Sequence, residues 1–362
     1  MGVLRAARRS SRIGAASAAA TVAFALALTG SGTSEAASHD PSTAAPITHH
    51  VTGEIDAVSC LTAHRCVAVG NTKVDGGEYV VVENGVPGKL RKVGTSGSLE
   101  AISCAGAAGC VALAQSITKP GPLLITFGRG GKPIRRAIPS VPANVSMSGI
   151  SCTAVKHCIL VGYDLEAQPN KLYVGVWNGH SISEHRVHGL KKNQDVDNVL
   201  VSCHGSHCLL VGAAEGATSV AGITVPIHDG HPGHLVRLSG DEFSAVECVS
   251  ATRCYATANR DSNPVIVTLS HGKKAAVAST TGTLYGIACS GNACTAVGIT
   301  NPPPSAHEPY DVGLVVKLSA GVITGTQTVA ASKTYVGVAR PGPHHALAVG
   351  PAQKKGSVTS LL

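Results

Sequence analysis

The chain has 362 residues and a formal charge of +8, and only 3% of its residues are aromatic. The first 37 residues hold four of the 29 basic and one of the 21 acidic side chains, which leaves the remainder at about +5. This mild balance, without a Lys/Arg-rich run, argues against a nucleic-acid partner. The length allows either several domains or one large domain built from repeats.

The amino-terminal segment has the pattern of an export signal. Four arginines form a basic head, a charge-free run over 13–34 follows, and Ala36 and Ala37 are small residues that suit signal peptidase. The run is rich in Ala, Gly, Ser and Thr, which is weakly apolar for a permanent span of about 20 residues. We therefore expect a signal peptide over 1–37, a flexible leader over 38–45 and a secreted or cell-surface protein without a stable membrane span. An uncleaved anchor is the alternative.

One motif recurs along the rest of the chain. Its first copy is Ala57-Val58-Ser59-Cys60, five intervening residues, and then Cys66-Val67-Ala68-Val69-Gly70. The first cysteines of the copies are 41 to 51 residues apart, which is typical of blade-type repeats. A seventh copy lacks both cysteines and has Arg340 and Ala346 in their places. The repeat therefore favours one repeat-built domain.

Each unit can be divided into four short strands. Val- and Ile-rich runs, punctuated by Gly, Pro and Asn, favour strands, and no sustained 3.6-residue period follows the signal. In the first unit the predicted strands cover 54–60, 66–70, 79–83 and 86–93, with a hairpin turn at Asn84-Gly85. The spacing predicts an all-β protein, a seven-bladed β-propeller with four-stranded blades over 46–362.

The seventh unit predicts how the ring closes. It has three candidate strands, at 335–339, 346–350 and 357–362, and then the sequence ends. The extended segment 46–51 lies just before the first unit, where every other junction has a fourth strand. We therefore expect this N-terminal strand to complete the last blade, so that no blade interface stays unpaired.

The cysteines predict disulfides within hairpins. All 12 lie in the exported part and fall into sequence-local pairs, and an even count in an oxidising compartment indicates disulfides. Structural zinc sites place paired cysteines two to four residues apart, whereas four of these pairs enclose five residues. A redox-active role would need an exposed thiol of low pKa. The predicted bridges are Cys60–Cys66, Cys104–Cys110, Cys152–Cys158, Cys203–Cys208, Cys248–Cys254 and Cys289–Cys294.

The units resemble the Ser-Cys…Cys-Val-Ala-Val-Gly…Trp-Asn-Gly repeats of secreted bacterial β-propellers, which are loosely related to sialidase-like, Asp-box propellers. The resemblance covers 46–362, and Trp177-Asn178-Gly179 is the fullest match to its second half. It implies an exported propeller and does not imply hydrolysis. The Asp-box pattern Ser-x-Asp-x-Gly-x-x-Trp is absent from the sequence, whose only tryptophan is Trp177.

Polar residues near the starts of the innermost strands and in the longer loops are the candidate ligand-binding set. The longer loops should lie on the face opposite the disulfides, where these side chains would line a polar pocket; solvation of a channel mouth is the alternative. The candidates are Asp56, Glu100, Asp197, Glu242, Asp164, Arg260, His307 and Tyr310. His228, His231 and His234 around Asp229 are a less favoured metal site, because polar turn residues are usually solvated. No metal and no cofactor are predicted.

The sequence carries no catalytic signature that we can assign. We therefore expect an exported, non-catalytic binding or scaffold module, a monomer, for a cell-envelope glycan, a peptide or a protein partner. The alternative is a glycan-acting hydrolase or lyase with a polar site at the central funnel, because paired carboxylates can perform glycoside chemistry.

Overall fold

The computed structural model divides by contacts into Met1–Asp40 and Pro41–Leu362. The first unit lies outside the residues that the structure describes, as do the predicted signal peptide and all of the predicted leader except Ala45. The account below therefore concerns the second unit. The described residues are 45–71, 76–94, 97–115, 122–137, 145–164, 171–191, 194–216, 220–260, 263–300, 312–330, 334–342, 345–352 and 355–361.

The described residues form seven antiparallel sheets, which we number as blades in chain order. Blade one consists of β2 (Glu54–Thr62), β3 (Arg65–Asn71), β4 (Gly77–Glu83), β5 (Val86–Pro87) and β6 (Arg91–Lys92). Blade two consists of β7 (Leu99–Cys104), β8 (Cys110–Gln115), β9 (Pro122–Phe127) and β10 (Pro133–Ala137). Blade three consists of β11 (Val145–Ala154), β12 (His157–Asp164), β13 (Leu172–Trp177) and β14 (Ile182–Arg186). Blades four and five are β15 (Asp195–His204), β16 (His207–Glu215), β17 (Val220–His228), β18 (His231–Pro232) and β19 (Val236–Ser239); and β20 (Asp241–Cys248), β21 (Arg253–Arg260), β22 (Asn263–Ser270) and β23 (Lys273–Ser279). Blades six and seven are β24 (Thr283–Ser290), β25 (Ala293–Thr300), β26 (Val312–Ser319) and β27 (Val322–Val329); and β28 (Gly337–Gly342), β29 (His345–Ala352), β30 (Lys355–Leu361) and β1 (Ile47–Val51).

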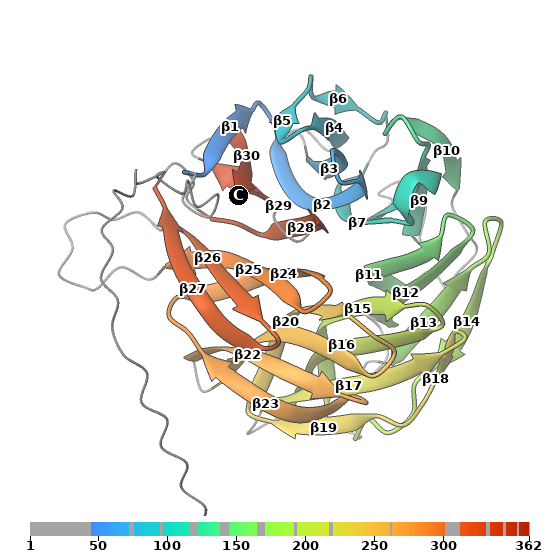
Figure 1. Ribbon diagram of the computed structural model, residues 1–362. Coiled ribbons are helices and arrows are strands. Elements are labelled where there is room, and N and C mark those ends of the chain that lie inside the picture. Colours follow the sequence, from blue (N-terminus) through green and yellow to red (C-terminus); the bar gives the residue numbers. More distant parts are fainter. Residues whose placement is uncertain are drawn as a thin grey trace, which may run out of the picture. The chain divides into compact units, whose positions relative to one another are not determined.

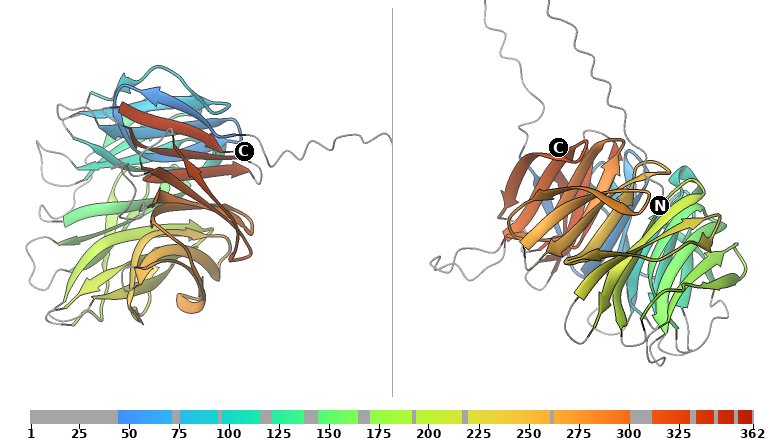
Figure 2. Two further views of the ribbon diagram at one scale, coloured as in Figure 1. Left: turned by 90° about the vertical axis from the view of Figure 1, so that its left-hand side faces the viewer. Right: turned by 90° about the horizontal axis from the view of Figure 1, so that it is seen from below.

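The blades form a ring. The first strand of each blade contacts that of the next in the order β2, β7, β11, β15, β20, β24, β28, and β28 contacts β2 again (Figure 1 and Figure 2). The all-β, seven-bladed β-propeller is thereby confirmed. Among the described residues, one 3₁₀ helix, η2 (Gly106–Ala108), interrupts the strands, and no helix has the length and apolar character that a membrane crossing needs.

The hydrophobic core consists of seven clusters, each between two neighbouring blades. Between blades two and three, for example, Leu124 packs with Met147 and Trp177, all of them buried. The apolar residue two positions before each first cysteine is buried in every blade, from Val58 to Val338. Burial between sheets therefore explains the apolar repeat in the sequence.

A β-bulge recurs in the first strand of six blades. The pairing register with the second strand shifts around Asp56, Glu100, Ser148, Asn198-Val199, Ser244 and Tyr285. Several bulge residues reach the backbone of the next blade: Ser148 Oγ donates to the Val199 carbonyl at 2.7 Å, and Ser244 Oγ donates to that of Leu284 at 2.7 Å. In blades three, four and five the bulge thus turns one side chain toward the neighbouring blade.

Six hairpins are closed by disulfides, in the pairs that the sequence predicts. The two cysteines of each pair are directly opposed in the register of the first and second strands, as at Cys60 and Cys66, and their Cα atoms are 3.8 to 4.0 Å apart. Because the bulge and the cysteines lie at opposite ends of the first strand, the disulfides lie at one end of the ring axis and the bulges toward the other.

Blade seven combines strands from both ends of the described chain. β1 pairs with β30 over five residues, from Ile47 opposite Ser360 to Val51 opposite Gly356. Buried Tyr335 donates a hydrogen bond from its hydroxyl to Thr359 Oγ1 at 2.9 Å, and Thr359 Oγ1 is 2.9 Å from Thr48 Oγ1. Segment 46–51 therefore lies beside β30 as the outer strand of the last blade.

Candidate functional site

A cavity of about 540 Å³ lies on the ring axis at the disulfide end. Residues from the first strand of all seven blades line it. It falls within the size range of small-ligand sites. The sequence predicted the site at the other end of the axis, so the location of this cavity is a finding of the structure.

A chain of serines surrounds much of this cavity. The residue just before the first cysteine is serine in blades one to four, and its Oγ accepts a hydrogen bond from the cysteine N–H of the next blade. These bonds join Ser59 to Cys104 at 3.0 Å, Ser103 to Cys152 at 2.8 Å, Ser151 to Cys203 at 3.0 Å and Ser202 to Cys248 at 2.9 Å. A hydroxyl that accepts in this way still has its own hydrogen to donate.

Glu247 takes the serine position in blade five. Ser202 Oγ donates to its Oε2 at 3.4 Å, and the carboxyl group faces the cavity. Burial raises the pKa of Glu247 to about 7, an effect that the hydrogen bond from Ser202 partly offsets. Near neutral pH this group therefore exists in both its charged and its neutral form.

Arg340 takes the cysteine position in blade seven. Its Nη1 donates to Thr295 Oγ1 in blade six at 2.6 Å, and burial lowers the pKa of its guanidinium group. Thr295 itself replaces an apolar residue: the equivalent position is Val67 in blade one and Val111 in blade two. The cavity thus has a fixed cation on one side, and guanidinium groups suit the binding of carboxylates.

The lining supports binding more directly than catalysis. Among the described residues that line the cavity, Glu247 is the one carboxylate and Arg340 the one cation, and the other polar side chains are the hydroxyls of serines and one threonine. Sequence reasoning missed Glu247 and Arg340 as site residues. The available signal was their departure from the repeat, a charge where other blades have serine or cysteine.

At the bulge end of the axis, several predicted residues do come together. Asp56 and Glu100 are both bulge residues, and the pKa of Asp56 is raised to about 6, mainly by burial and then by the charges of Glu54 and Glu100. Burial also raises the pKa of Glu100. Burial raises the pKa of the Tyr163 hydroxyl, and the nearby charges of Asp197 and Glu100 raise it further. This end is therefore acidic.

The remaining predicted residues are dispersed. Asp164 is buried at the end of β12, Glu242 is exposed on β20, and His307 and Tyr310 lie outside the described residues. Arg260 forms an ion pair with fully buried Asp241 at 2.7 Å, and Lys274 pairs with the same carboxylate. Arg260 of β21 thus forms a salt bridge with Asp241 of β20 within blade five.

The three candidate metal ligands lie around the outer turn of blade four. His228 Nδ1 is 2.9 Å from Asp229 Oδ2, and the His231 ring packs against that of His185 with centroids 4.7 Å apart. His234 lies in the segment that joins β18 and β19. Within the described ranges, no group of three or more His, Cys, Asp or Glu side chains has an arrangement that could hold a metal ion.

Comparison with known proteins extends the fold assignment. No family model and no curated protein matches the sequence. The structure is similar to the β-propeller domain of Cps50 (Swd1) from Myceliophteria thermophila, with 11% identity, a TM-score of 0.59 and coverage of 87% of this chain and 98% of that one. The structure of the RRP9 WD40 repeats is 10% identical, with a TM-score of 0.58 and coverage of 86% of this chain and 96% of that one. The structure of YCF48 bound to D1 peptide is also 10% identical, with a TM-score of 0.57 and coverage of 88% of this chain and 97% of that one. Identities this low show a shared fold alone.

Proposed function

We propose that the protein is an exported binding module whose axial cavity beside the disulfides holds a segment of a peptide or protein partner. The main support is the axial cavity of about 540 Å³, which is lined by hydroxyl groups, one carboxyl group and one guanidinium group. Propellers commonly serve as scaffolds for protein partners, and the structurally similar YCF48 was solved with a bound peptide. A rigid ring with inward-facing donors suits such a role, because preorganised groups lose little entropy on binding.

A substitution that fills the cavity tests this function. Ala288 occupies the serine position in blade six and lines the cavity, and the same position in blade five holds the long side chain of Glu247. We therefore expect Ala288→Met to fold and to occupy part of the cavity. Peptides selected from a phage-displayed random heptapeptide library should bind the wild-type protein and lose at least about tenfold affinity for this variant, by isothermal titration calorimetry.

The matched control is Ala276→Met, which adds the same side chain to exposed β23. It should leave the affinities unchanged. Selection that enriches no peptide, or selected peptides that bind Ala288→Met as tightly as the wild type, would overturn the proposed function.

Export is the second part of this proposal. Six disulfides are typical of proteins in an oxidising compartment, and the basic head and small residues of the first 37 residues match a cleaved signal. Expressed from its full gene in a bacterial host, the protein should accumulate outside the cytoplasm with a new amino terminus near Ala37. Mass spectrometry of the intact protein measures this; a cytoplasmic product that keeps residue 1 would contradict it.

The bulge end of the axis supports one alternative, a glycan-acting hydrolase or lyase. Asp56 and Glu100 are carboxyl groups on neighbouring blades, and burial raises the pKa of each, which suits the general acid of such a reaction. Activity on a panel of cell-wall polysaccharides that disappears in Glu100→Gln would favour this alternative. Activity that survives this substitution would exclude Glu100 from the reaction.

A further inference from the structure

A second cavity, of about 280 Å³, lies between blade seven and blade one. Its apolar walls come from Ala346 and Leu347 of β29 and from Cys66 and Val82 of blade one, and the polar residues His64 and His345 lie at its edge. Ala346 and Leu347 are buried, and so are Cys66 and Val82. The pocket therefore offers a mostly apolar surface beside the polar axial cavity.

Blade seven lacks the disulfide that the other six blades carry, and the two residues in its place face blade six. Ala346 occupies the second cysteine position, so a methyl group stands where six other blades carry a sulfur bridge. The residue in the first cysteine position, Arg340, directs its guanidinium toward blade six, where it donates to Thr295. Leu347, the next residue along β29, packs instead in the cluster between blades seven and one and forms the blade-seven wall of the pocket.

The two cavities adjoin each other. Ala63 and Pro341 line both of them, so a ligand can extend from the axis into the pocket without crossing a blade. Ala63 belongs to the turn between β2 and β3, and Pro341 lies next to Arg340 on β28.

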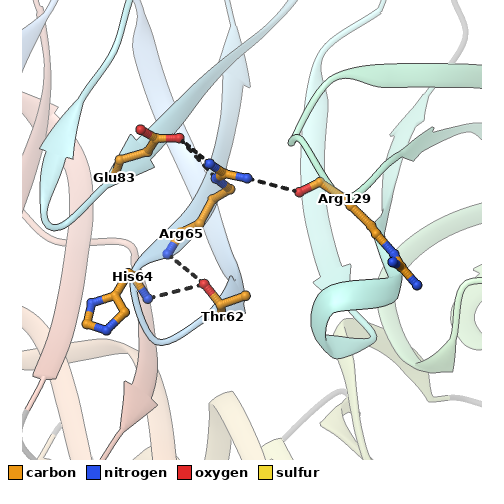
Figure 3. A network of polar contacts seen from close by, with 5 residues as sticks. All are labelled: Thr62, His64, Arg65, Glu83 and Arg129. Carbon is orange, nitrogen blue, oxygen red and sulfur yellow. Dashed lines mark hydrogen bonds and ion pairs between the residues drawn. The ribbon is translucent and has the colours of Figure 1, made fainter.

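A polar network fixes the turn that separates the cavities (Figure 3). The backbone N–H groups of His64 and Arg65 donate to Thr62 Oγ1 at 3.3 and 3.1 Å. The Arg65 guanidinium pairs with Glu83 at 2.7 Å and reaches the Arg129 carbonyl of blade two at 3.5 Å. In Figure 3 the His64 ring lies on the other side of the turn from the Arg65–Glu83 pair. The turn is thereby held before any ligand arrives.

We propose that the two cavities form one bipartite site for a peptide: Arg340 and the serine hydroxyls hold a carboxylate on the axis, and the pocket between blades seven and one holds the neighbouring apolar side chain. This inference rests on the proposed peptide-binding function and deepens it. The carboxylate is either the free carboxyl terminus of the peptide or an Asp or Glu side chain.

Three observations select a carboxylate. The single cation among the described lining residues matches a single negative charge, and a guanidinium binds a carboxylate through two parallel hydrogen bonds. Ser59, Ser103 and Ser151 accept backbone bonds and can donate their hydroxyl hydrogens to ligand oxygens. Glu247 opposes an anion only when charged, and burial raises its pKa to about 7.

Four fluorescein-labelled peptides test the site by fluorescence anisotropy. They are Gly-Gly-Ala-Leu as the free acid, the same peptide as the amide, Gly-Gly-Leu-Glu amide, and Gly-Gly-Ala-Ala as the free acid. We expect one carboxylate-bearing leucine peptide to bind at least about tenfold more tightly than the leucine amide. The free acid identifies a terminal carboxylate as the source, and the Glu amide identifies a side chain. The alanine free acid should bind more weakly than the leucine free acid.

Three variants assign the halves of the site. Arg340→Gln should remove the preference for a carboxylate and keep the preference for leucine, whereas Arg340→Lys should restore part of the former. Ser360→Met, at the position opposite Leu347 in the sheet register, adds bulk to the pocket and should remove only the preference for leucine. Thermal unfolding verifies that each variant is folded. These paired readouts distinguish ligand contact from a general loss of structure.

The proposal is overturned if neither carboxylate peptide binds more tightly than the amide, or if the carboxylate preference persists in Arg340→Gln and the leucine preference persists in Ser360→Met. If library-selected peptides still require an open axial cavity, by the Ala288→Met test, the proposed function stands and the bipartite site fails alone. If those peptides bind Ala288→Met as tightly as the wild type, both the proposed function and the bipartite site are overturned.

Discussion

At the scale of single residues, the serine before the first cysteine in blades one to four joins neighbouring blades. It is a small residue whose hydroxyl satisfies the cysteine N–H of the next blade, so four of the seven innermost junctions share one hydrogen-bonding device. A backbone N–H that loses its partner in a buried setting costs free energy. The apolar residue and the cysteine on either side of this serine were evident in the sequence, but the role of the serine was not.

Ser151→Ala should lower the free energy of unfolding by about 1 kcal/mol, because the Cys203 N–H loses its acceptor. The alanine itself fits, since blade six has Ala288 in this position. Urea denaturation measures the difference. The control Ser239→Ala, at the exposed last residue of β19, should change stability by less than about 0.5 kcal/mol. Equal losses in the two variants would contradict a special role for Ser151.

Glu247 makes stability depend on pH. An acid whose pKa is raised by folding, here from 4.5 to about 7, binds more protons in the folded state, so its neutral form favours the fold and this advantage is lost as pH rises toward and past 7. Glu247→Gln should reduce the decline in stability between pH 5 and pH 8 by about 2 kcal/mol. Urea melts at both pH values measure this. The variant Glu242→Gln, on the exposed side of the same strand, should leave the decline unchanged.

At the scale of elements, the close approach of the first two strands explains the glycine that ends the repeat in blades one and three. Gly70 and Gly162 face the bulged part of the first strand, and a Cβ on either would overlap a backbone carbonyl, of Glu54 and Ser146 respectively. Blades two and five carry Ala114 and Ala258 in this position. The requirement therefore comes from how closely two particular strands approach each other.

Gly70→Ala should destabilise the protein by about 2 kcal/mol or more, because the new methyl group forces the two strands apart. Gly212→Ala is the matched variant: in blade four the nearest atom to a new Cβ is the Asp197 carbonyl oxygen at 3.3 Å. Its effect should be smaller by at least about 1 kcal/mol in the same urea experiment. Similar losses would mean that the approach to the bulge does not decide the residue.

At the scale of the whole molecule, the pairing of β1 with β30 brings the two ends of the described chain into one sheet. Removing the residues before Thr52 from the protein that starts at Pro46 should lower its stability by about 2 kcal/mol or more, because β30 becomes an exposed edge and buried Val51 is lost. An excess of a synthetic peptide of residues 46–51 should restore part of the loss. Identical thermal midpoints with and without the strand would refute this expectation.

The sequence predicts the architecture well because the architecture repeats. Seven alignable copies disclose strands, hairpins and cysteine pairs, and a register such as Cys60 opposite Cys66 follows from local geometry. The site is harder to predict, because the end of the axis that stays open depends on how side chains of seven separate strands fill the centre. Asp56 and Glu100 were found by their place in the repeat, whereas Glu247 and Arg340 had to be recognised as exceptions to it.

The replacement of one cysteine pair has a further effect on a ring of near-identical blades. If the seven blades were equivalent, a ligand bound on the axis could take seven equivalent orientations around it, and none would be preferred. Arg340 in blade seven and Glu247 in blade five make the orientations unequal, because only one of them places an anionic group of the ligand beside the guanidinium. The least regular blade thus gives an almost symmetric receptor a defined angular orientation.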